Sequence, residues 1–168
     1  MIASGKSPAK LDSSEALNAL AGAVEETCIE LARQIPADGE GATHLVEICV
    51  SGARSDSDAD KIARAIASSN LVKTAVTGND PNWGRIVSAA GYCGADFEMN
   101  DVDLKLNGQS VFEQGQPVDF CEKTVSQMLS DSFETLIELS VGSGPGEARH
   151  WTSDLTKAYV EFNSEYTS

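Results

Sequence analysis

The chain has 168 residues, of which 41% are hydrophobic, and its formal net charge is −14 at pH 7. This length and composition suit one ordinary domain with its own core, so a single globular unit is expected over residues 1–168. The negative charge repels phosphates and anionic lipid headgroups, which argues against nucleic-acid and membrane-surface partners. No apolar run is long enough to span a bilayer, and the first residues lack the anatomy of a signal peptide.

The cysteines are too scattered to suggest a metal site. Cys28, Cys49, Cys93 and Cys121 form no Cys-x-x-Cys pair, and the chain has only two histidines. Cys28 and Cys49 fall on apolar stripes, so we interpret them as buried thiols. This use of cysteine fits a reducing, cytoplasmic compartment.

The first half of the chain predicts alternating helices and strands. Apolar residues recur at helical spacing from Ser13 to about Ile35, with Asp12 as a candidate N-cap and Pro36 at the far end. Residues 45–51 form an apolar, β-branched run that indicates a buried strand. A helix over 58–69 and a second strand over 71–76 would complete a β-α-β unit, and Asp80-Pro81 indicates the start of a short helix ending before Gly91.

The second half begins with a hairpin signal. Asn107-Gly108 tolerates positive φ at both central positions of a type I′ turn, between strands at 102–106 and 109–112. We expect a helix over 120–128, a strand over 133–141, a flexible glycine-rich connection over 142–146 and a strand around His150. Asp154 is a candidate cap for a last helix through Tyr159 to Phe162. Residue reasoning alone therefore gives an acidic domain of helices and strands.

Two motifs leave alternatives open. Gly39-Glu40-Gly41 either lets a ligand's ammonium group approach the carboxylate or is a solvated turn, and acid-glycine turns are common. Residues 78–85 either hold an anion at a helix start or form a capped turn with a core tryptophan. Neither His44 nor His150 has a Ser, Cys or Asp nearby at a spacing that indicates a catalytic triad, so both are interpreted as structural or surface residues.

A resemblance to a known family adds the chemistry. Residues 69–86, Ser-Asn-Leu-Val-Lys-Thr-Ala-Val-Thr-Gly-Asn-Asp-Pro-Asn-Trp-Gly-Arg-Ile, resemble the central signature of the ornithine acetyltransferases, the bifunctional glutamate N-acetyltransferases of arginine biosynthesis. Residues 38–43 resemble a second family segment, and residues 151–160 and 163–168 resemble the family's carboxy terminus. The resemblance implies an α+β fold of mixed β-sheets layered with helices, corresponding to the C-terminal portion of the family's β chain.

The family mechanism uses a nucleophile that this sequence does not contain. Family members cut themselves before a threonine, whose hydroxyl then accepts an acetyl group from N-acetylornithine and passes it to glutamate, with its own α-amine as base. The α chain supplies the oxyanion hole. Residues 1–5 resemble a strand downstream of that threonine, so we expect a β chain shortened at its N-terminus. None of Thr27, Thr43 or Thr74 is a substitute, and no catalytic residue is assigned.

The resemblance assigns three substrate-binding residues, Glu40, Asn163 and Ser168. A carboxylate can pair with an ammonium group, and an amide or hydroxyl can bond a carboxylate or acetamide. It implies the α chain of the same precursor as partner, in an α2β2 heterotetramer, no metal or prosthetic group, and acetyl-CoA as a second acetyl donor in bifunctional members. The alternative is a non-catalytic binding or structural module that kept the fold and lost the chemistry.

Overall fold

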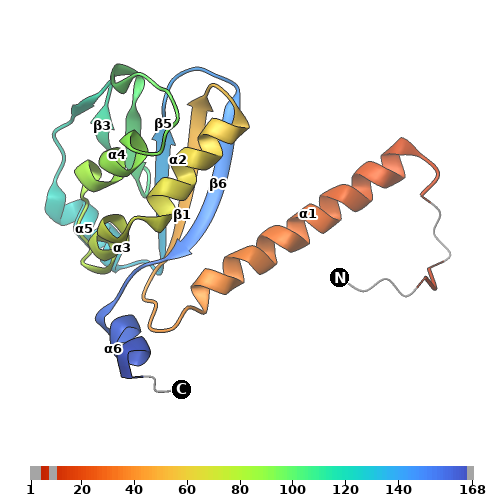
Figure 1. Ribbon diagram of the computed structural model, residues 1–168, viewed down its shortest axis with the longest axis horizontal. Coiled ribbons are helices and arrows are strands. Elements are labelled where there is room, and N and C mark those ends of the chain that lie inside the picture. Colours follow the sequence, from red (N-terminus) through yellow and green to blue (C-terminus); the bar gives the residue numbers. More distant parts are fainter. Residues whose placement is uncertain (1–4, 8–10, 166–168) are drawn as a thin grey trace.

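A single mixed sheet organises the chain in the computed structural model, which describes residues 5–7 and 11–165 (Figure 1). Its strand order is β4-β3-β2-β5-β1-β6. The strands are β1 (Leu45–Ala53), β2 (Asp103–Leu106), β3 (Gln109–Glu113), β4 (Gln116–Pro117), β5 (Glu134–Ser140) and β6 (Gly146–Ser153). β1 runs parallel to β5 and antiparallel to β6, and the other neighbouring pairs are antiparallel. The expected α+β fold with a mixed sheet is confirmed.

One face of the sheet is covered by helices. They are α2 (Asp56–Ser68), α3 (Asn70–Thr77) and α4 (Trp83–Gly91), while α5 (Glu122–Ser130) and the 3₁₀ turn η1 (Met99–Asp101) lie nearer the hairpin. Strand alternation turns Val46, Ile48 and Val50 into the core, where Ile62 and Ile66 of α2 meet them. Trp83 stacks on Phe112 with ring centroids 5.1 Å apart. The core therefore lies between this helical layer and one sheet face.

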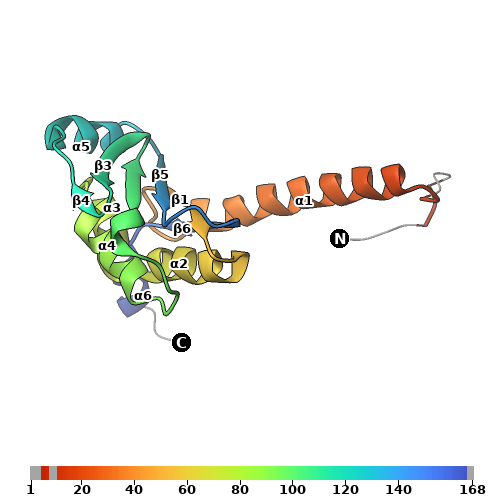
Figure 2. The same ribbon diagram turned by 90° about the horizontal axis from the view of Figure 1, so that it is seen from above.

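The other sheet face has no covering layer among the described residues. Glu47 and Cys49 of β1 pair with Trp151 and Arg149 of β6 there, and all four remain at least partly exposed. Helix α1 (Ser14–Ala37) meets the sheet only near its own C-terminal end and then projects away from the body (Figures 1 and 2).

The predicted first helix is confirmed, but its apolar stripe is not buried. No residue of α1 is buried, and four large apolar side chains are exposed: Leu17, Leu20, Leu31 and Ile35. The interpretation of Cys28 as a buried thiol was therefore wrong, because the stripe that carries it has no packing surface within the described residues; Cys49 is half-buried. The N-cap is Ser13 rather than Asp12, and Pro36 lies inside the last turn.

The predicted strand over 71–76 is wrong, and with it the β-α-β unit. These residues form α3, capped by the Ser69 side chain, which accepts from Val72 N, and they bury Val72, Ala75 and Val76 at helical spacing. A short apolar run does not by itself distinguish a strand from a buried helix. Arg85 of α4 donates to the Leu71 carbonyl at 2.9 Å, so the 69–86 signature joins α3 to α4.

Three further predictions concern a helix start, a hairpin turn and a glycine-rich segment, and the hairpin turn is confirmed. Helix α4 begins at Trp83 with Asn82 as N-cap, not at Asp80-Pro81. Asn107 and Gly108 have φ of 47° and 81°, which confirms the I′-type hairpin between β2 and β3. The 142–146 segment is held rather than loose, since Gly144 N donates to Gly52 O at 3.0 Å and a Cβ on Gly144 would lie 2.1 Å from Ala53 O.

Candidate functional site

The loop between α1 and β1 carries Glu40 in a conformation that requires glycine beside it. Gly41 has φ +68°, and a Cβ there would lie 2.9 Å from Tyr159 N and 3.0 Å from Ala158 Cβ. The Gly41 carbonyl accepts from the Thr156 hydroxyl at 2.8 Å. The loop is therefore pressed against the start of α6 (Lys157–Glu165), and the Glu40 side chain is left exposed beside that helix.

Asn163, one of the residues assigned by resemblance, lies on α6 and reaches Glu40. Its Nδ2 is 3.2 Å from Glu40 Oε2 and 2.9 Å from the Tyr159 carbonyl, so its two amide hydrogens point to two different acceptors. Both Glu40 and Asn163 are exposed. The structure thus brings together two residues that are 123 positions apart, while Ser168 lies outside the described residues.

A buried polar group joins the Glu40 loop to the segment that leads into α6. Asp154 follows β6, and its side chain is completely buried. Its Oδ1 accepts from Thr43 N at 2.9 Å and His44 N at 3.2 Å, and its Oδ2 accepts from the Thr43 hydroxyl at 2.5 Å. The Thr77 hydroxyl, at the end of α3, is 3.0 Å from Oδ2 and 2.9 Å from the Leu155 carbonyl. We refer to Asp154, Thr43, His44 and Thr77 as the Asp154 cluster.

The hydrogen bonds keep Asp154 ionised inside the protein. Burial opposes the charged form, but donation from Thr43, His44 and Thr77 outweighs it and lowers the pKa of Asp154 below its usual range. The expectation that Asp154 caps the last helix was wrong, because Thr156 takes that role by accepting from Tyr159 N at 3.2 Å. Sequence reasoning missed the cluster because its members lie on three separate segments.

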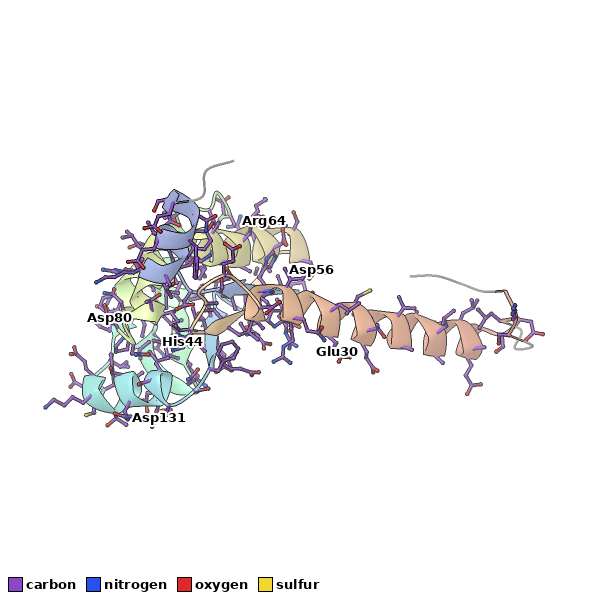
Figure 3. The ribbon with its side chains drawn as sticks, turned by 90° about the horizontal axis from the view of Figure 1, so that it is seen from below. Glu30, His44, Asp56, Arg64, Asp80 and Asp131 are labelled. Atoms are coloured by element: carbon purple, nitrogen blue, oxygen red, sulfur yellow. The ribbon has the colours of Figure 1, made fainter. Side chains whose placement is uncertain are left out.

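The two histidines are structural, as expected from the sequence. His44 is buried, and its Nδ1 lies 3.0 Å from the Thr43 hydroxyl and 3.5 Å from Asp154 Oδ2. Figure 3 shows His44 close to the point where α1 joins the body, with Glu30 further along that helix. His150 Nε2 is 2.7 Å from Asp60 of α2. Within residues 5–7 and 11–165, no group of three or more His, Cys, Asp or Glu side chains is arranged to hold a metal ion. None of the helices in that range could cross a membrane.

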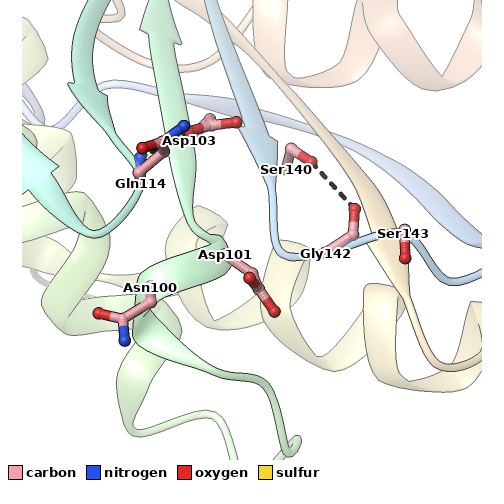
Figure 4. Close-up of a pocket in the computed structure, with 7 residues that line it drawn as sticks. All are labelled: Asn100, Asp101, Asp103, Gln114, Ser140, Gly142 and Ser143. Carbon is pink, nitrogen blue, oxygen red and sulfur yellow. Dashed lines mark hydrogen bonds between the residues drawn. The ribbon is translucent and has the colours of Figure 1, made fainter.

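An acidic hollow of about 460 Å³ lies at the opposite end of the strands (Figure 4). It is lined by Asn100, Asp101, Asp103, Gln114, Ser140, Gly142 and Ser143. Gln114 N donates to Asp103 at 2.8 Å, so part of this acidic lining is already satisfied within the fold. β1 begins beside Glu40 and its Ser51 pairs with Ser140, so this hollow is separate from the Glu40–Asn163 pair.

The Glu40–Asn163 pair can recognise an amino acid. A carboxylate binds an ammonium group by a charge-assisted hydrogen bond, and an amide can donate to, or accept from, a carboxylate or acetamide. An acid and an amide placed side by side can thus bind and orient such a ligand.

Comparison with known proteins gives one consistent result. The chain is 48% identical over 160 residues to the arginine biosynthesis bifunctional protein ArgJ of Rhodopirellula baltica, covering 95% of this chain and 39% of that protein. It is 43% identical over 169 residues to the glutamate N-acetyltransferase of Methanopyrus kandleri, covering 99% and 43%. The chain thus spans about two fifths of the length of these relatives.

The fold agrees with the sequence comparison. The crystal structure of the arginine biosynthesis bifunctional protein argJ from Bacillus halodurans superposes with a TM-score of 0.88 at 35% identity, covering 94% of this chain and 74% of that one. The family model described as "ArgJ family" matches residues 1–168. The chain belongs to the ArgJ family.

Proposed function

We propose that this chain supplies part of the substrate pocket of an acetyltransferase that moves an acetyl group from N-acetylornithine to glutamate. The observation that carries the proposal is the contact between Asn163 Nδ2 and Glu40 Oε2, 3.2 Å apart and both exposed. Each substrate carries an ammonium group and a carboxylate, which an acid and an amide side by side can bind. Ser168, at the chain end, would add a hydroxyl donor to the same pocket.

The reaction in this proposal consists of two acyl exchanges. An N-terminal threonine hydroxyl attacks the acetamide carbonyl, its proton passes to the threonine amine, and ornithine leaves with that proton. The glutamate amine then attacks the acetyl ester and restores the hydroxyl. Glu40 and Asn163 hold the substrates during both steps, while the nucleophile and the oxyanion donors lie outside the 168 residues. No metal takes part, and acetyl-CoA would be an alternative acetyl donor.

The proposed partner is the α chain that precedes the β chain in a self-cleaving precursor, with two copies of each in a cytoplasmic α2β2 assembly. Support comes from surfaces that a lone domain would not expose. The apolar stripe of α1 is unburied, and the sheet face that carries Cys49 and Arg149 has only part of α1 beside it among the described residues. A partner chain would bury both.

Acetyl transfer provides the test. The 168-residue chain alone should produce no N-acetylglutamate from N-acetylornithine and glutamate. Joined to the upstream part of the Rhodopirellula baltica protein, which it resembles at 48% identity, it should regain transfer. Deleting residues 166–168 from the joined protein should raise KM for N-acetylornithine without stopping self-cleavage. Turnover by the pure chain alone, retained in Glu40→Ala, would overturn the proposal. A joined protein that binds N-acetylornithine but never turns it over would favour a binding module.

A further inference from the structure

Helix α6 is not held in place by the hydrophobic core. None of its residues is buried, and Tyr159, Val160 and Phe162 are 44%, 54% and 63% exposed. Apolar burial, the usual source of helix placement in a domain, therefore contributes little to its position. Since α6 carries Asn163, something else must fix that residue relative to Glu40.

Polar contacts take the place of apolar burial. The Thr156 hydroxyl accepts from Tyr159 N at the start of α6 and donates to the Gly41 carbonyl, one residue after Glu40. Two residues before Thr156, Asp154 binds the other end of the same loop through both Thr43 and His44. Asp154 N also donates to the His44 carbonyl at 3.2 Å. Hydrogen bonds therefore run from the loop to the Asp154 segment and from that segment back to the loop.

The carboxylate of Asp154 suits this role because its acceptor capacity is nearly filled. A carboxylate offers about four lone-pair sites. Two backbone N–H groups and the Thr43 hydroxyl occupy three of them, and the Thr77 hydroxyl reaches the fourth from α3. Hydrogen bonds are directional, so these bonds define an orientation as well as a distance. The carboxylate thereby joins the loop, the helical layer and the segment leading into α6.

We propose that Asp154 is a positioning residue for the substrate pair: its buried carboxylate holds the loop that carries Glu40 and the segment that leads to the Asn163 helix in one fixed arrangement. Asp154 fixes Glu40 relative to Asn163 within this chain; the consequence for catalysis rests on the function proposed above. Removing the carboxylate would leave the backbone N–H groups of Thr43 and His44 and the Thr43 hydroxyl without their acceptor, whereas the Thr77 hydroxyl would keep the Leu155 carbonyl. The segment could then no longer keep its register against the loop.

Nuclear magnetic resonance of the whole 168-residue chain tests the geometry without any substrate. In the unmodified chain, Glu40→Gln should shift the side-chain amide resonances of Asn163, because the two groups are in contact. In chains carrying Asp154→Asn or Asp154→Ala, that response to Glu40→Gln should be lost or at least halved. Backbone amides of residues 157–165 should also exchange at least tenfold faster, while β1 and β5 keep their protection. Thr77→Val, which removes one donor and preserves shape, should give a smaller effect in the same direction.

A core substitution separates positioning from general destabilisation. Val125→Ala on α5 removes a buried side chain distant in sequence from both segments, so it should speed exchange across the sheet but leave the Asn163 response intact. An unchanged Asn163 response in Asp154→Asn and Thr77→Val, or a loss of equal size in Val125→Ala, would overturn the proposal.

The kinetic arm uses the joined protein described above. Asp154→Asn should raise KM for N-acetylornithine at least tenfold with a smaller change in kcat, since the residue does not touch the reacting atoms. If the Asn163 response is lost but KM does not move, Asp154 is only structural and the catalytic part of the proposal is wrong. If the unmodified joined protein shows no transfer at all, the proposed function fails, and the resonance experiment alone decides whether Asp154 sets the geometry.

Discussion

Replacing Gly41 by Ala would show how closely the Glu40 loop and α6 must approach. A non-glycine residue at φ +68° costs about 1–2 kcal/mol. The added Cβ would lie 2.9 Å from Tyr159 N, which belongs to the helix backbone and cannot turn aside, so α6 must move. That movement weakens the 2.8 Å bond from Thr156 to the Gly41 carbonyl, worth about 0.5–1.5 kcal/mol. The free energy of unfolding should therefore fall by about 2–3 kcal/mol.

Urea denaturation with a matched control measures this cost. Gly22 lies inside α1 and a Cβ there would meet nothing within 4 Å. Gly22→Ala should therefore be neutral or stabilise the chain by up to about 1 kcal/mol, because alanine favours helix. Hydrogen exchange in α6 should quicken in Gly41→Ala only. If the free energy of unfolding of Gly41→Ala lies within about 0.5 kcal/mol of that of the unmodified chain and α6 exchange is unchanged, α6 does not constrain the loop.

Three other outcomes are expected. In the joined protein, Glu40→Gln should lower kcat/KM for N-acetylornithine about ten- to a hundredfold, since a charge-assisted hydrogen bond is worth about 1.5–3 kcal/mol. An unchanged kcat/KM would mean that Glu40 does not bind the substrate. The pKa of Asp154 lies below its usual 3.8, so its carboxylate stabilises the fold above that pH and the contribution is lost as the pH falls through the lowered value. The stability gap between the chain and Asp154→Asn, measured by acid titration, should therefore be widest near neutrality and shrink below pH 3.8, and a constant gap would contradict this. Replacing Leu17 and Leu31 together by Ser should reduce the self-association measured by sedimentation, while the circular dichroism spectrum of the chain stays the same. Unchanged self-association would mean that the apolar stripe of α1 does not cause it.

Periodicity predicted the elements whose pattern was long or chemically specific. Helical spacing over 13–35 predicted α1, the β-branched run over 45–51 predicted β1, and Asn107-Gly108 predicted the turn between β2 and β3. All three elements are present. Residues 71–76 did not form the predicted strand, because a six-residue run in which all but Lys73 are apolar or β-branched fits a strand or nearly two turns of helix equally well, and the Ser69 cap decides between them. The exposure of the α1 stripe was beyond prediction, since a sequence shows which face is apolar but not what covers it.

The candidate site depended on different information. Residue types around Glu40 favoured a solvated turn, and only the family resemblance singled out Glu40 and Asn163. Their contact could not be read from the sequence, because 123 residues separate them and the bond forms only after β6 returns beside β1. The Asp154 cluster had no sequence signal beyond an acid near a helix start, which was attributed to the wrong role. Local patterns predicted most of the helices but placed their N-caps one or two residues away, and they do not reveal a carboxylate shared by three distant segments.

A site fixed by polar contacts on an unburied helix should be less stable than the sheet that supports it. The amides of β1 and β5 belong to strands that bury Ile48, Ile137 and Leu139, whereas no residue of α6 is buried. Local opening requires least free energy where few apolar contacts are lost, so α6 can detach while the sheet stays folded. At low urea concentrations, amides of residues 157–165 should therefore exchange before those of β1 and β5. The Asn163 amide resonances should lose their response to Glu40→Gln over the same range. Exchange of α6 and the sheet at one common midpoint would instead place the helix in the same cooperative unit as the core, and the polar contacts would then be stronger than this argument allows.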